Sequence, residues 1–376
     1  MPLTVRALDD ASASAWDNFV TAMPDGTFCH RAAWARVIEA AFRHRTHFAF
    51  AERDGAVTGV LPLVHVKTRL FGNTLVSSPF CVYGGVLAAD AESAAALEAH
   101  AIALMRRTGA SAVELRDRTP AAANPGGDAA VEPAGTGLLA SGSVAGAPSA
   151  AAPAGGDWQR RPDLYVTFRK PIEADHDRNM KAIPRKQRAM VRKGIQHGLT
   201  SLCNRDTRTL HRVYAESVRN LGTPVVSRRY FDILLAAFGD SVDVVTVLDG
   251  DSAIAAVMNF YFREEVLPYY GGGTADARHK AGNDFMYWEV MRRAADRGYR
   301  LFDFGRSKVG TGAHAFKHNW GFQPAPLNYR YRLAPGAAIP DRNPLNPKYR
   351  MFIAAWKRLP LAVANVLGPP IVRGLG

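Results

Sequence analysis

The sequence predicts a mixed α/β fold made of two similar units that follow one another along the chain. With 376 residues, of which 47% are hydrophobic, the chain is long enough to form two cores. Each half contains two strand-favouring runs joined by an Asp-Gly turn, at 54–55 in the first half and at 249–250 in the second. We therefore expect a β-hairpin at the same place in each unit.

The segments that follow the two hairpins repeat one order of elements. Each has a glycine-rich strand end, a helix that stops at a glycine, and a further strand. In both halves 32 positions separate the tyrosine of the glycine-rich motif from the apolar centre of the last strand, from Tyr83 to Leu115 and from Tyr270 to Phe302. This match favours a tandem arrangement of two related units.

Helices are expected over residues 90–108 and 284–297, each followed by a strand. In the second helix, apolar residues recur every four positions and predict a face that packs on a sheet. Asn283 or Asp284 is the expected N-cap of this helix, and Gly298 is a suitable residue just beyond its end.

The domain boundaries follow from these elements. We predict an N-terminal domain over 1–170, a C-terminal catalytic domain over 171–335 that begins with a basic helix, and a last segment, 336–376, that packs on the domains. Residues 119–157 are almost entirely Ala, Gly, Pro and Ser. They contain too few large apolar side chains to offset the entropy of ordering, so we expect a flexible insertion.

The overall composition limits the classes of partner and compartment. A formal net charge of +13 favours anionic partners such as phosphates, nucleotides, nucleic acid or an acidic membrane face. The three cysteines are far apart, which predicts neither disulfides nor a zinc site and fits a reducing cytoplasm. No secretory signal and no apolar run of the ~18 residues needed to span a bilayer are present, so we expect a soluble, intracellular protein.

A strongly basic stretch runs from Lys181 to Lys193, with six basic residues and no acidic one. Like charges stacked on a helix repel, so the stretch predicts an anionic partner such as a phosphate-rich substrate, RNA or a lipid headgroup. It contains no aromatic side chain to stack on bases, which weighs against nucleic acid. A solvated helix face is the alternative. At helical spacing four of the basic residues share one face: Lys181, Arg185, Arg188 and Arg192.

A glycine-rich stretch precedes the second predicted helix. Glycines let the backbone approach a ligand closely, and the N-terminus of a helix can bind an anion such as a pyrophosphate. The alternative is a plain glycine turn followed by a solvated basic loop. The stretch consists of Tyr269, Tyr270, Gly271, Gly272 and Gly273, followed by Arg278, His279 and Lys280.

A single carboxylate, Asp303, lies within an otherwise apolar predicted strand. Because neighbouring side chains of a strand point to opposite faces, it projects away from Phe302 and Phe304. A carboxylate in such a place is either paired or performs chemistry. Asp303 therefore either forms an ion pair with Arg306 or Lys317 or acts as a general base.

The segment after this strand is polar and rich in glycine, and we expect it to form a loop that closes over a substrate. Its polar residues are Arg306, Ser307, Lys308 and Lys317. Ser307 does not lie in a G-x-S-x-G sequence, and His44 and His47 have no metal-ligating partners at suitable spacing. The residues therefore predict direct group transfer without a nucleophile triad or a metal.

The last 26 residues mix apolar side chains with basic ones, among them Lys357, Arg358 and Arg373. Such a mixture is compatible with contact at a membrane surface. Because prolines interrupt the segment, packing against a domain is the favoured interpretation.

The segments "YYGGG", "NDFMYWEVMRRAADRGYRLFDFGRSKVGTGAHAFKHNWGF" and "NPLNPKYR" together resemble FemAB-like proteins of bacterial exopolysaccharide and PEP-CTERM/exosortase systems. These proteins belong to the GNAT-type acyl-CoA N-acyltransferase superfamily. The basic stretch resembles the start of the second domain of Fem-type ligases, where basic side chains meet the phosphates of a cell-wall precursor. The GNAT pyrophosphate signature, Q/R-x-x-G-x-G/A, corresponds at best to "HKAGND", which differs at its first and last residues.

The resemblance implies two GNAT-like domains in tandem. It also implies transfer of an acyl or aminoacyl group to an amine or hydroxyl of an envelope glycan or its precursor. The donor would be acyl-CoA or aminoacyl-tRNA, with no tightly bound cofactor. The protein would be cytoplasmic, with peripheral contact at the inner face of the membrane. The alternative is a non-enzymatic adaptor that binds an anionic glycan or nucleic acid.

Carried onto this sequence, the resemblance makes Asp303 the candidate base, in a catalytic group with Arg306 and Lys317. Together with Lys308, these two basic residues would bind a negatively charged ligand. The implied acyl or acceptor channel is lined by Tyr270, Gly271, Gly272 and Gly273, with Ser307 nearby. The phosphates of the acceptor would meet Lys181, Arg185, Arg188 and Arg192, and those of the donor would meet Lys280, Gly282 and Asn283.

Overall fold

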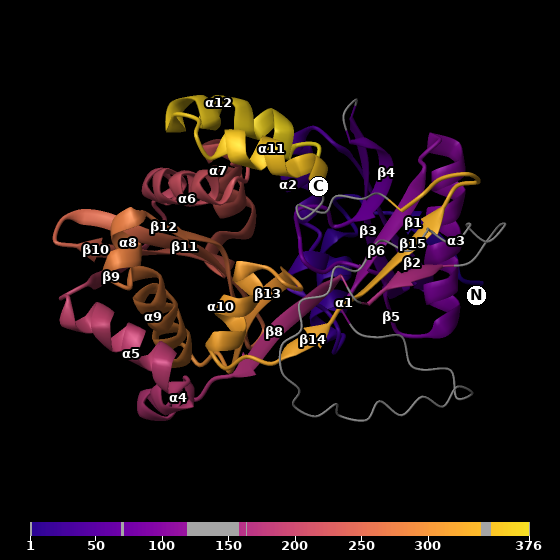
Figure 1. Ribbon diagram of the computed structural model, residues 1–376. Coiled ribbons are helices and arrows are strands. Elements are labelled where there is room, and N and C mark those ends of the chain that lie inside the picture. The colour runs from indigo at the N-terminus through magenta and orange to yellow at the C-terminus, as the bar shows by residue number, and fades with distance from the viewer. Residues whose placement is uncertain (1, 69–70, 119–157, 163, 340–346, 376) are drawn as a thin grey trace, which may run out of the picture.

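The computed structural model describes residues 2–68, 71–118, 158–162, 164–339 and 347–375. Within these residues the chain forms two mixed β-sheets flanked by helices, one in each half of the molecule (Figure 1). The predicted mixed α/β fold of two units is therefore confirmed. The insertion predicted at 119–157 lies outside the described residues.

The first sheet is built mainly from the N-terminal half. Its strands run in the order β1-β2-β3-β4-β6-β15-β7, with β5 pairing β3. Three helices belong to this half: α1 (Ala13–Ala22), α2 (Trp34–Phe42) and α3 (Ala91–Thr108). The strands are β1 (Thr4–Ala7), β2 (Arg45–Arg53), β3 (Ala56–Thr68), β4 (Gly72–Ser77), β5 (Leu87–Ala88), β6 (Ala112–Asp117), β7 (Gln159–Arg161) and β15 (Asn328–Leu333).

The second sheet follows the order β14-β8-β13-β12-β11-β10-β9. Its strands are β8 (Tyr165–Pro171), β9 (Thr200–Asn204), β10 (Val242–Asp249), β11 (Ser252–Phe262), β12 (Glu265–Gly273), β13 (Leu301–Lys308) and β14 (Pro324–Pro326). Its helices are α4 (His176–Ala182), α5 (Arg185–Gln196), α6 (Thr207–Leu221), α7 (Arg228–Phe238), α8 (Ala275–His279), α9 (Gly282–Asp296) and α10 (Gly312–Asn319).

The two sheets exchange strands across the boundaries predicted at 170 and 335. β8 precedes the first of these boundaries almost entirely, yet it pairs with β13 and β14 in the second sheet. β15 comes after the whole second sheet and pairs with β6 and β7 in the first. Each sheet is thus completed by a strand from the other part of the chain, which ties the two halves together.

The predicted turns and most helix ends are confirmed. Asp54 and Gly55 both have positive φ, 53° and 77°, as the tight β2–β3 hairpin requires. Asp90 caps α3 by accepting a hydrogen bond from the Ser93 backbone N–H. The expected N-cap of the second helix was wrong, because α9 begins at Gly282 after Ala281, a residue in the left-handed conformation. The preceding helix α8 turns the chain at this point, a feature that residue type alone does not show.

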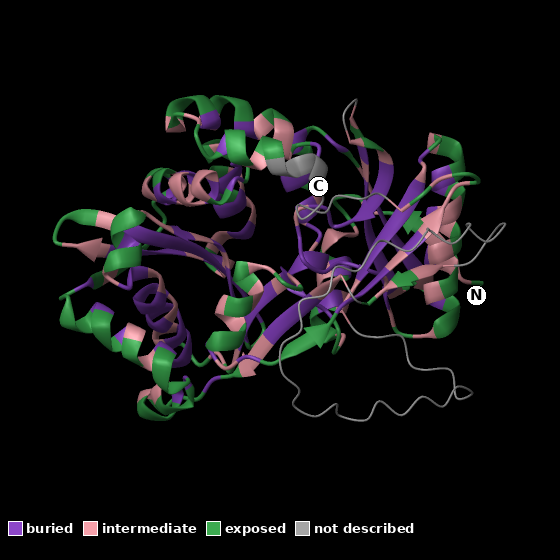
Figure 2. Ribbon diagram, viewed as in Figure 1, coloured by how far each residue is buried: buried purple, intermediate pink, exposed green. Residues whose placement is uncertain are grey.

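The largest hydrophobic core runs across both halves. It joins side chains of β2–β4 in the first half to those of α6, α7, β11 and β12 in the second. Phe28, for example, stacks on Phe260 with ring centroids 4.5 Å apart. Figure 2 shows the buried residues concentrated along the strands of both sheets and at the junction between them. The two units are therefore packed as one body.

The strands β12 and β13 separate soon after they start. They are parallel neighbours and pair only at Glu265 with Leu301 and at Val266 with Phe302. Beyond these pairs, β12 has a bulge opposite β11, so that Tyr269 is an extra residue between Pro268 and Tyr270. The gap that opens between the two strands positions the candidate active site.

The C-terminal segment forms two helices, α11 (Pro347–Trp356) and α12 (Leu361–Val372), which lie over α6 and reach toward the first half (Figure 1). The imidazole of His44 lies 2.6 Å from the carbonyl oxygen of Arg373, which joins the end of this segment to the first sheet's half. None of the helices in the described parts of the chain is long and apolar enough to cross a membrane.

Candidate active site

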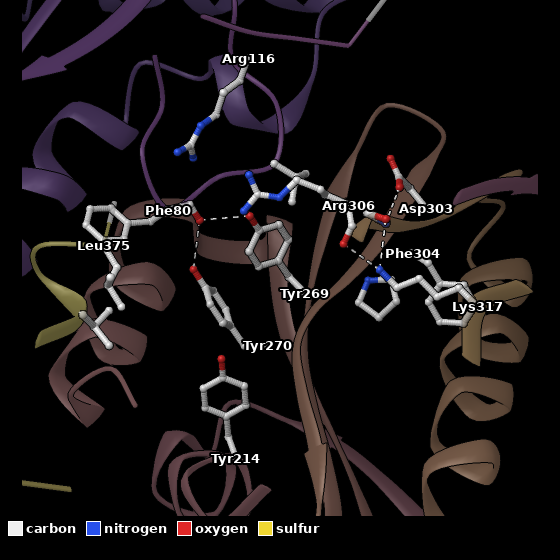
Figure 3. A pocket seen from close by; sticks show the side chains of 14 residues that line it. Phe80, Arg116, Tyr214, Tyr269, Tyr270, Asp303, Phe304, Arg306, Lys317 and Leu375 are labelled. Atoms are coloured by element: carbon white, nitrogen blue, oxygen red, sulfur yellow. Dashed lines mark hydrogen bonds between the residues drawn. The ribbon is translucent and has the colours of Figure 1, made fainter. Parts of the chain in front are cut away.

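A pocket of about 330 Å³ lies where β12 and β13 separate, and we call it the central pocket. Both halves and the C-terminal segment contribute to its wall (Figure 3). It lies at an interface between the two halves of the molecule, where ligand pockets are common. It is lined by Phe80, Val82, Arg116, Tyr214, Pro268, Tyr269, Tyr270, Asp303, Phe304, Gly305, Arg306, Lys317, Val372 and Leu375.

Asp303 is fully buried and held by groups from both halves. The hydroxyl of Tyr83 donates to it, at 2.8 Å from Oδ2 and 3.1 Å from Oδ1. The backbone N–H of Gly305 donates to Oδ1 at 2.6 Å, and Nε of Arg169 lies 3.3 Å from Oδ2. Burial raises the pKa of this carboxyl, while Arg169 opposes that shift. Asp303 therefore links β13 to the first half as well as to β8.

The local backbone explains how β13 places this carboxylate. The register between β13 and β8 shifts between Asp303 and Arg306, which indicates a bulge. Gly305 lies in that bulge with a φ of +66°, a left-handed conformation that glycine adopts without a steric penalty. Phe302 and Phe304 point into the second core, as the alternation of the strand predicts. Among the described side chains, the ion-pair partner of Asp303 is Arg169, not Arg306 or Lys317.

Lys317 extends from α10 to the opposite side of the same bulge. Its Nζ donates to the carbonyl oxygens of Gly305, at 3.1 Å, and of Arg306, at 3.0 Å (Figure 3). Burial lowers the pKa of this amine to about 7; the charge of Asp303 opposes that shift, and the charge of Arg306 adds to it. A neutral amine at this position keeps a lone pair after both carbonyl contacts are made, so it can accept a proton near neutral pH.

Arg306 is oriented by aromatic residues, not by a carboxylate. Its Nη1 donates to the hydroxyl of Tyr329 at 2.9 Å, and its guanidinium lies 4.4 Å from the ring centroid of Tyr165. Tyr329 in turn donates to the carbonyl oxygen of Val82 at 2.8 Å. The cation thus lies beside the pocket without an anionic side chain bound to it among the described residues, which leaves it suited to an anionic ligand.

Tyr269 and Tyr270 of β12, with Tyr214 of α6, form the aromatic wall of the pocket. Tyr269 donates to the carbonyl oxygen of Phe80 at 3.0 Å, and Tyr270 reaches the same oxygen at 3.5 Å (Figure 3). The bulge in β12 explains why two consecutive side chains reach one atom, since it interrupts the alternation of the strand. The hydroxyls of Tyr270 and Tyr230 are 2.7 Å apart. This network fixes Phe80 and joins the two halves around the pocket.

The glycines predicted to line a channel do not line the central pocket. A Cβ atom at Gly272 would lie 2.5 Å from Ser217 Cβ, and one at Gly271 would lie 3.0 Å from Val257 Cγ2. A Cβ atom at Gly273 would lie 2.5 Å from Asn283 Oδ1. These glycines let neighbouring helices pack closely on the end of β12, whereas Tyr270 does face the pocket.

The three residues predicted to bind donor phosphates lie near the start of α9 and do not line the central pocket. Nζ of Lys280 pairs with Asp249 at 2.5 Å. Gly282 is buried, and its backbone packs on Ala277 of α8. Asn283 lies against Gly273. Their role in binding a donor stays a prediction.

Ser307 and Lys308 continue β13 instead of forming a loop. Ser307 is buried opposite Val166 of β8, and its hydroxyl has no hydrogen-bond partner among the described residues. Nζ of Lys308 lies 5.9 Å from the ring centroid of Tyr165. Neither residue lines the central pocket, so their predicted contact with a substrate is not tested by its geometry.

Three of the four predicted basic residues line a second cavity on α5, of about 480 Å³, which we call the basic cavity. It is lined by Arg185, Arg188, Ala189, Arg192 and Gln196. No acidic side chain of the described residues pairs with these three arginines. Lys181 lies in the last turn of the preceding helix α4 and is exposed. The opposite face of α5 packs on α9, where Gln187 donates to the carboxylate of Asp284. The predicted basic face is therefore present for the three arginines of α5, separate from the central pocket. It was wrong for Lys181, because α4 ends at Ala182 and a new helix begins at Arg185 after Pro184.

Several residues that line the central pocket or hold Asp303 were not predicted as site residues. Tyr83 lies in the glycine-rich motif of the first half, whose similarity to the Tyr270 motif was the one signal available for it. Arg169 and Arg116 come from strands that carry no motif. Val372 and Leu375 come from the tail, and only the folded chain brings them to the pocket. Among the described residues, no group of three or more His, Cys, Asp or Glu side chains could hold a metal ion.

Comparison with known proteins gives a match for part of the chain. Residues 178–318 match a family model described as "Acetyltransferase (GNAT) domain". This span includes the basic cavity, β12, β13 and Lys317. A search of curated protein sequences found no match.

Solved structures of similar fold cover nearly the whole chain. FemX is 14% identical with a TM-score of 0.62, and the match covers 88% of this chain and 97% of FemX. A tandem GNAT protein from the clavulanic acid biosynthesis pathway is 14% identical with a TM-score of 0.53, covering 90% of this chain and 100% of that one. L-PGS from Bacillus licheniformis is 10% identical with a TM-score of 0.51, and the match covers 94% of this chain and 96% of L-PGS.

At these identities the structural matches define the fold alone. The implied arrangement of two GNAT-like domains is confirmed by neighbours that span both halves. The chain therefore has a tandem GNAT-like fold, and its residues 178–318 match the GNAT acetyltransferase family model.

Proposed function

We propose that this protein is an acyl- or aminoacyl-transferase whose reaction takes place in the central pocket. The observation that carries the proposal is the gap between β12 and β13, which lies within the matched acetyltransferase domain and holds Lys317 beside Arg306. An amine poised to exchange a proton near neutral pH, next to a cation and apolar tyrosines, is suited to transfer of an acyl group.

In the proposed reaction the amine or hydroxyl of the acceptor attacks the carbonyl carbon of the donor directly. Neutral Lys317 takes the proton that the acceptor loses, and the resulting ammonium returns it to the leaving group. Backbone N–H groups of β12 that have no partner in β13 stabilise the oxyanion of the tetrahedral intermediate. Asp303, which was the expected base, instead positions the bulge that holds Lys317, because Tyr83, Gly305 and Arg169 already occupy its oxygens.

We further propose that the acceptor is an envelope glycan or its phosphorylated precursor in exopolysaccharide assembly, of the kind found with PEP-CTERM/exosortase systems. The basic cavity supports this, since its arginines have the charge and geometry to bind phosphates. The donor is acyl-CoA or aminoacyl-tRNA. The fold shared with FemX and with L-PGS is compatible with either donor.

Two measurements test the transferase proposal. Mass spectrometry of the purified protein under native conditions should detect a bound acyl-CoA or aminoacyl-tRNA. With acyl-CoA and an amine acceptor in solution, release of free thiol should depend on Lys317 and should be at least about 10²-fold slower in Lys317→Met. Thiol release that is equal in wild type and Lys317→Met would contradict the proposed reaction.

The second candidate function is a non-enzymatic adaptor that binds an anionic glycan. The basic cavity favours it, because this cavity shares no residue with the central pocket and does not require its chemistry. Binding of a phosphorylated glycan without any transfer from either donor class would support the adaptor over the enzyme.

A further inference from the structure

The C-terminal helix α12 is apolar on nearly every side, yet half of it is exposed. Its inner face packs tightly, since a Cβ atom at Gly368 would lie 2.7 Å from the carbonyl oxygen of Val225. Ala364, on the same face, is also buried. Its outer face is formed by Val363, Val366, Leu367 and Pro370, which have the spacing of one helical stripe and are all exposed. Val366 is 73% exposed. A helix that is apolar all round is expected to be buried, so this stripe lacks a partner.

The neighbouring helix α11 extends the apolar surface. Met351 is 83% exposed and Phe352 is 41% exposed. Ile353, the next residue along the chain, lies against Gly222 at the end of α6, where Leu221 is 64% exposed. Figure 2 shows that both tail helices expose much of their outer surface. Neither cavity includes any of these exposed side chains. The apolar surface is therefore separate from both the central pocket and the basic cavity.

Basic side chains flank this apolar surface at both ends of α12. Lys357 and Arg358 are exposed in the turn before the helix, and Arg373 is exposed just after it. The sequence from 347 to 375 contains no acidic residue. None of the three cations forms an ion pair with an acidic side chain of the described residues. An apolar stripe with positive charge at both ends is complementary to an anionic lipid surface, where acyl chains lie beneath negative headgroups.

We propose that α11 and α12 form a membrane-docking surface that binds anionic lipid bilayers at their interface. The 12 residues of α12 span roughly 18 Å, which is shorter than the ~30 Å hydrocarbon core, so the helix lies in the interface and does not cross it. Val372 and Leu375, at the end of the same segment, line the central pocket. Docking through this surface holds that pocket next to the bilayer. The proposal does not depend on the reaction assigned to the pocket.

The test is flotation of the full-length protein with vesicles. We expect binding to vesicles of equimolar phosphatidylcholine and phosphatidylglycerol, and weak or no binding to pure phosphatidylcholine. The double variant Val366→Asp, Leu367→Asp should lose this binding, whereas Leu202→Asp should retain it. Leu202 is a matched control because it is 50% exposed and lies on β9, an edge strand of the second sheet. Because Leu202, Val366 and Leu367 are all exposed, these variants should melt at the wild-type temperature. If an aspartate variant is unstable, serine at the same positions provides a milder test.

Two charge-reversal double variants test whether the lipid binds at the membrane-docking surface or at the basic cavity. Lys357→Glu with Arg358→Glu should weaken binding to the anionic vesicles by about tenfold or more at low salt. Arg185→Glu with Arg188→Glu, which changes the net charge equally, should leave vesicle binding within about twofold of wild type. Vesicle binding lost only in the second pair would overturn the proposal, because the basic cavity would then hold the lipid.

Two other results would also overturn it. One is the absence of wild-type binding to both kinds of vesicle. The other is a dimer by light scattering that becomes a monomer in the Val366→Asp, Leu367→Asp variant without any vesicle binding, which would assign the surface to a second copy of the chain.

Discussion

The central pocket and the basic cavity differ in how their charges are compensated. In the pocket, Asp303 is held by Tyr83, by Arg169 and by a backbone N–H group, so the pocket is organised before any ligand arrives. On α5, the arginines at 185, 188 and 192 face solvent without an acidic partner among the described residues. A preorganised buried group suits chemistry, whereas unpaired surface cations suit binding of an anion. Substitutions in the two regions should therefore have different effects.

The largest effect is expected for Lys317→Met. Loss of the proton acceptor should lower kcat by about 10² to 10⁴-fold, with little change in the binding of an anionic acceptor. The same variant should be more stable than wild type at pH 7. Burial depresses the pKa of Lys317, so the folded protein binds this proton less tightly than the unfolded chain does.

Steady-state kinetics and a thermal melt measure the two effects together. Lys186→Met, which removes an exposed lysine of α5, serves as the control and should change neither kcat nor the melting temperature. A Lys317→Met variant with normal kcat would show that Lys317 has no chemical role.

Asp303→Asn should act mainly on stability. It removes a buried charge that links β13 to Tyr83 and Arg169, and breaking such a pair costs about 3 kcal/mol of unfolding free energy. Activity of the fraction that remains folded should fall as well, since the bulge positions Lys317. Urea denaturation followed by kinetics at low temperature separates the two. A variant that is fully stable but inactive would restore Asp303 as the base.

Arg188→Ala with Arg192→Ala should affect binding but not chemistry. Loss of two phosphate contacts should weaken binding of a polyanionic acceptor by about tenfold and reduce its salt dependence. Because these side chains are outside the central pocket, kcat at saturation should be unchanged. Titrations at several salt concentrations give the slope of the logarithm of the binding constant against the logarithm of the salt concentration. Equal slopes for variant and wild type would remove the basic cavity from acceptor binding.

Tyr83→Phe should act on stability alone. This change keeps the ring and removes the hydroxyl that donates to Asp303, at a cost of about 1.5 to 3 kcal/mol for a hydrogen bond to a charged group. Arg169 and Gly305 still hold the carboxylate, so the pocket keeps its shape. Chemical denaturation quantifies the cost. Complete loss of folding would mean that this hydroxyl has a larger structural role than its contacts indicate.

Residue patterns predicted turns and helix ends well, but they did not predict which distant strands pair with one another. Hairpin turns and the ends of α3 follow from short-range chemistry, such as the Asp-Gly turn and the Asp90 cap. The exchange of β8 and β15 between the sheets depends on pairing across more than 100 positions, which no local pattern encodes. For that reason Arg169, which sits on β8, was not expected beside Asp303.

The candidate site was predicted by residue type more successfully than by role. The acid in an apolar strand drew attention to Asp303, and helical spacing identified the three arginines of the basic cavity. The role of Lys317 depends on its desolvation and on two carbonyl oxygens of β13, which only the folded chain supplies. The glycines after Tyr270 were expected near a ligand, yet their missing side chains make room for neighbouring helices.

The central claim is that Lys317 acts as a base with a pKa near 7, and the pH dependence of kcat tests it most directly. The account predicts a rate that rises with pH and levels off above an inflection at about 7. In Lys317→Arg, whose side chain stays charged, that inflection should disappear and the rate should stay low. A wild-type rate that falls as pH rises through 7, or an inflection that persists in Lys317→Arg, would contradict the account.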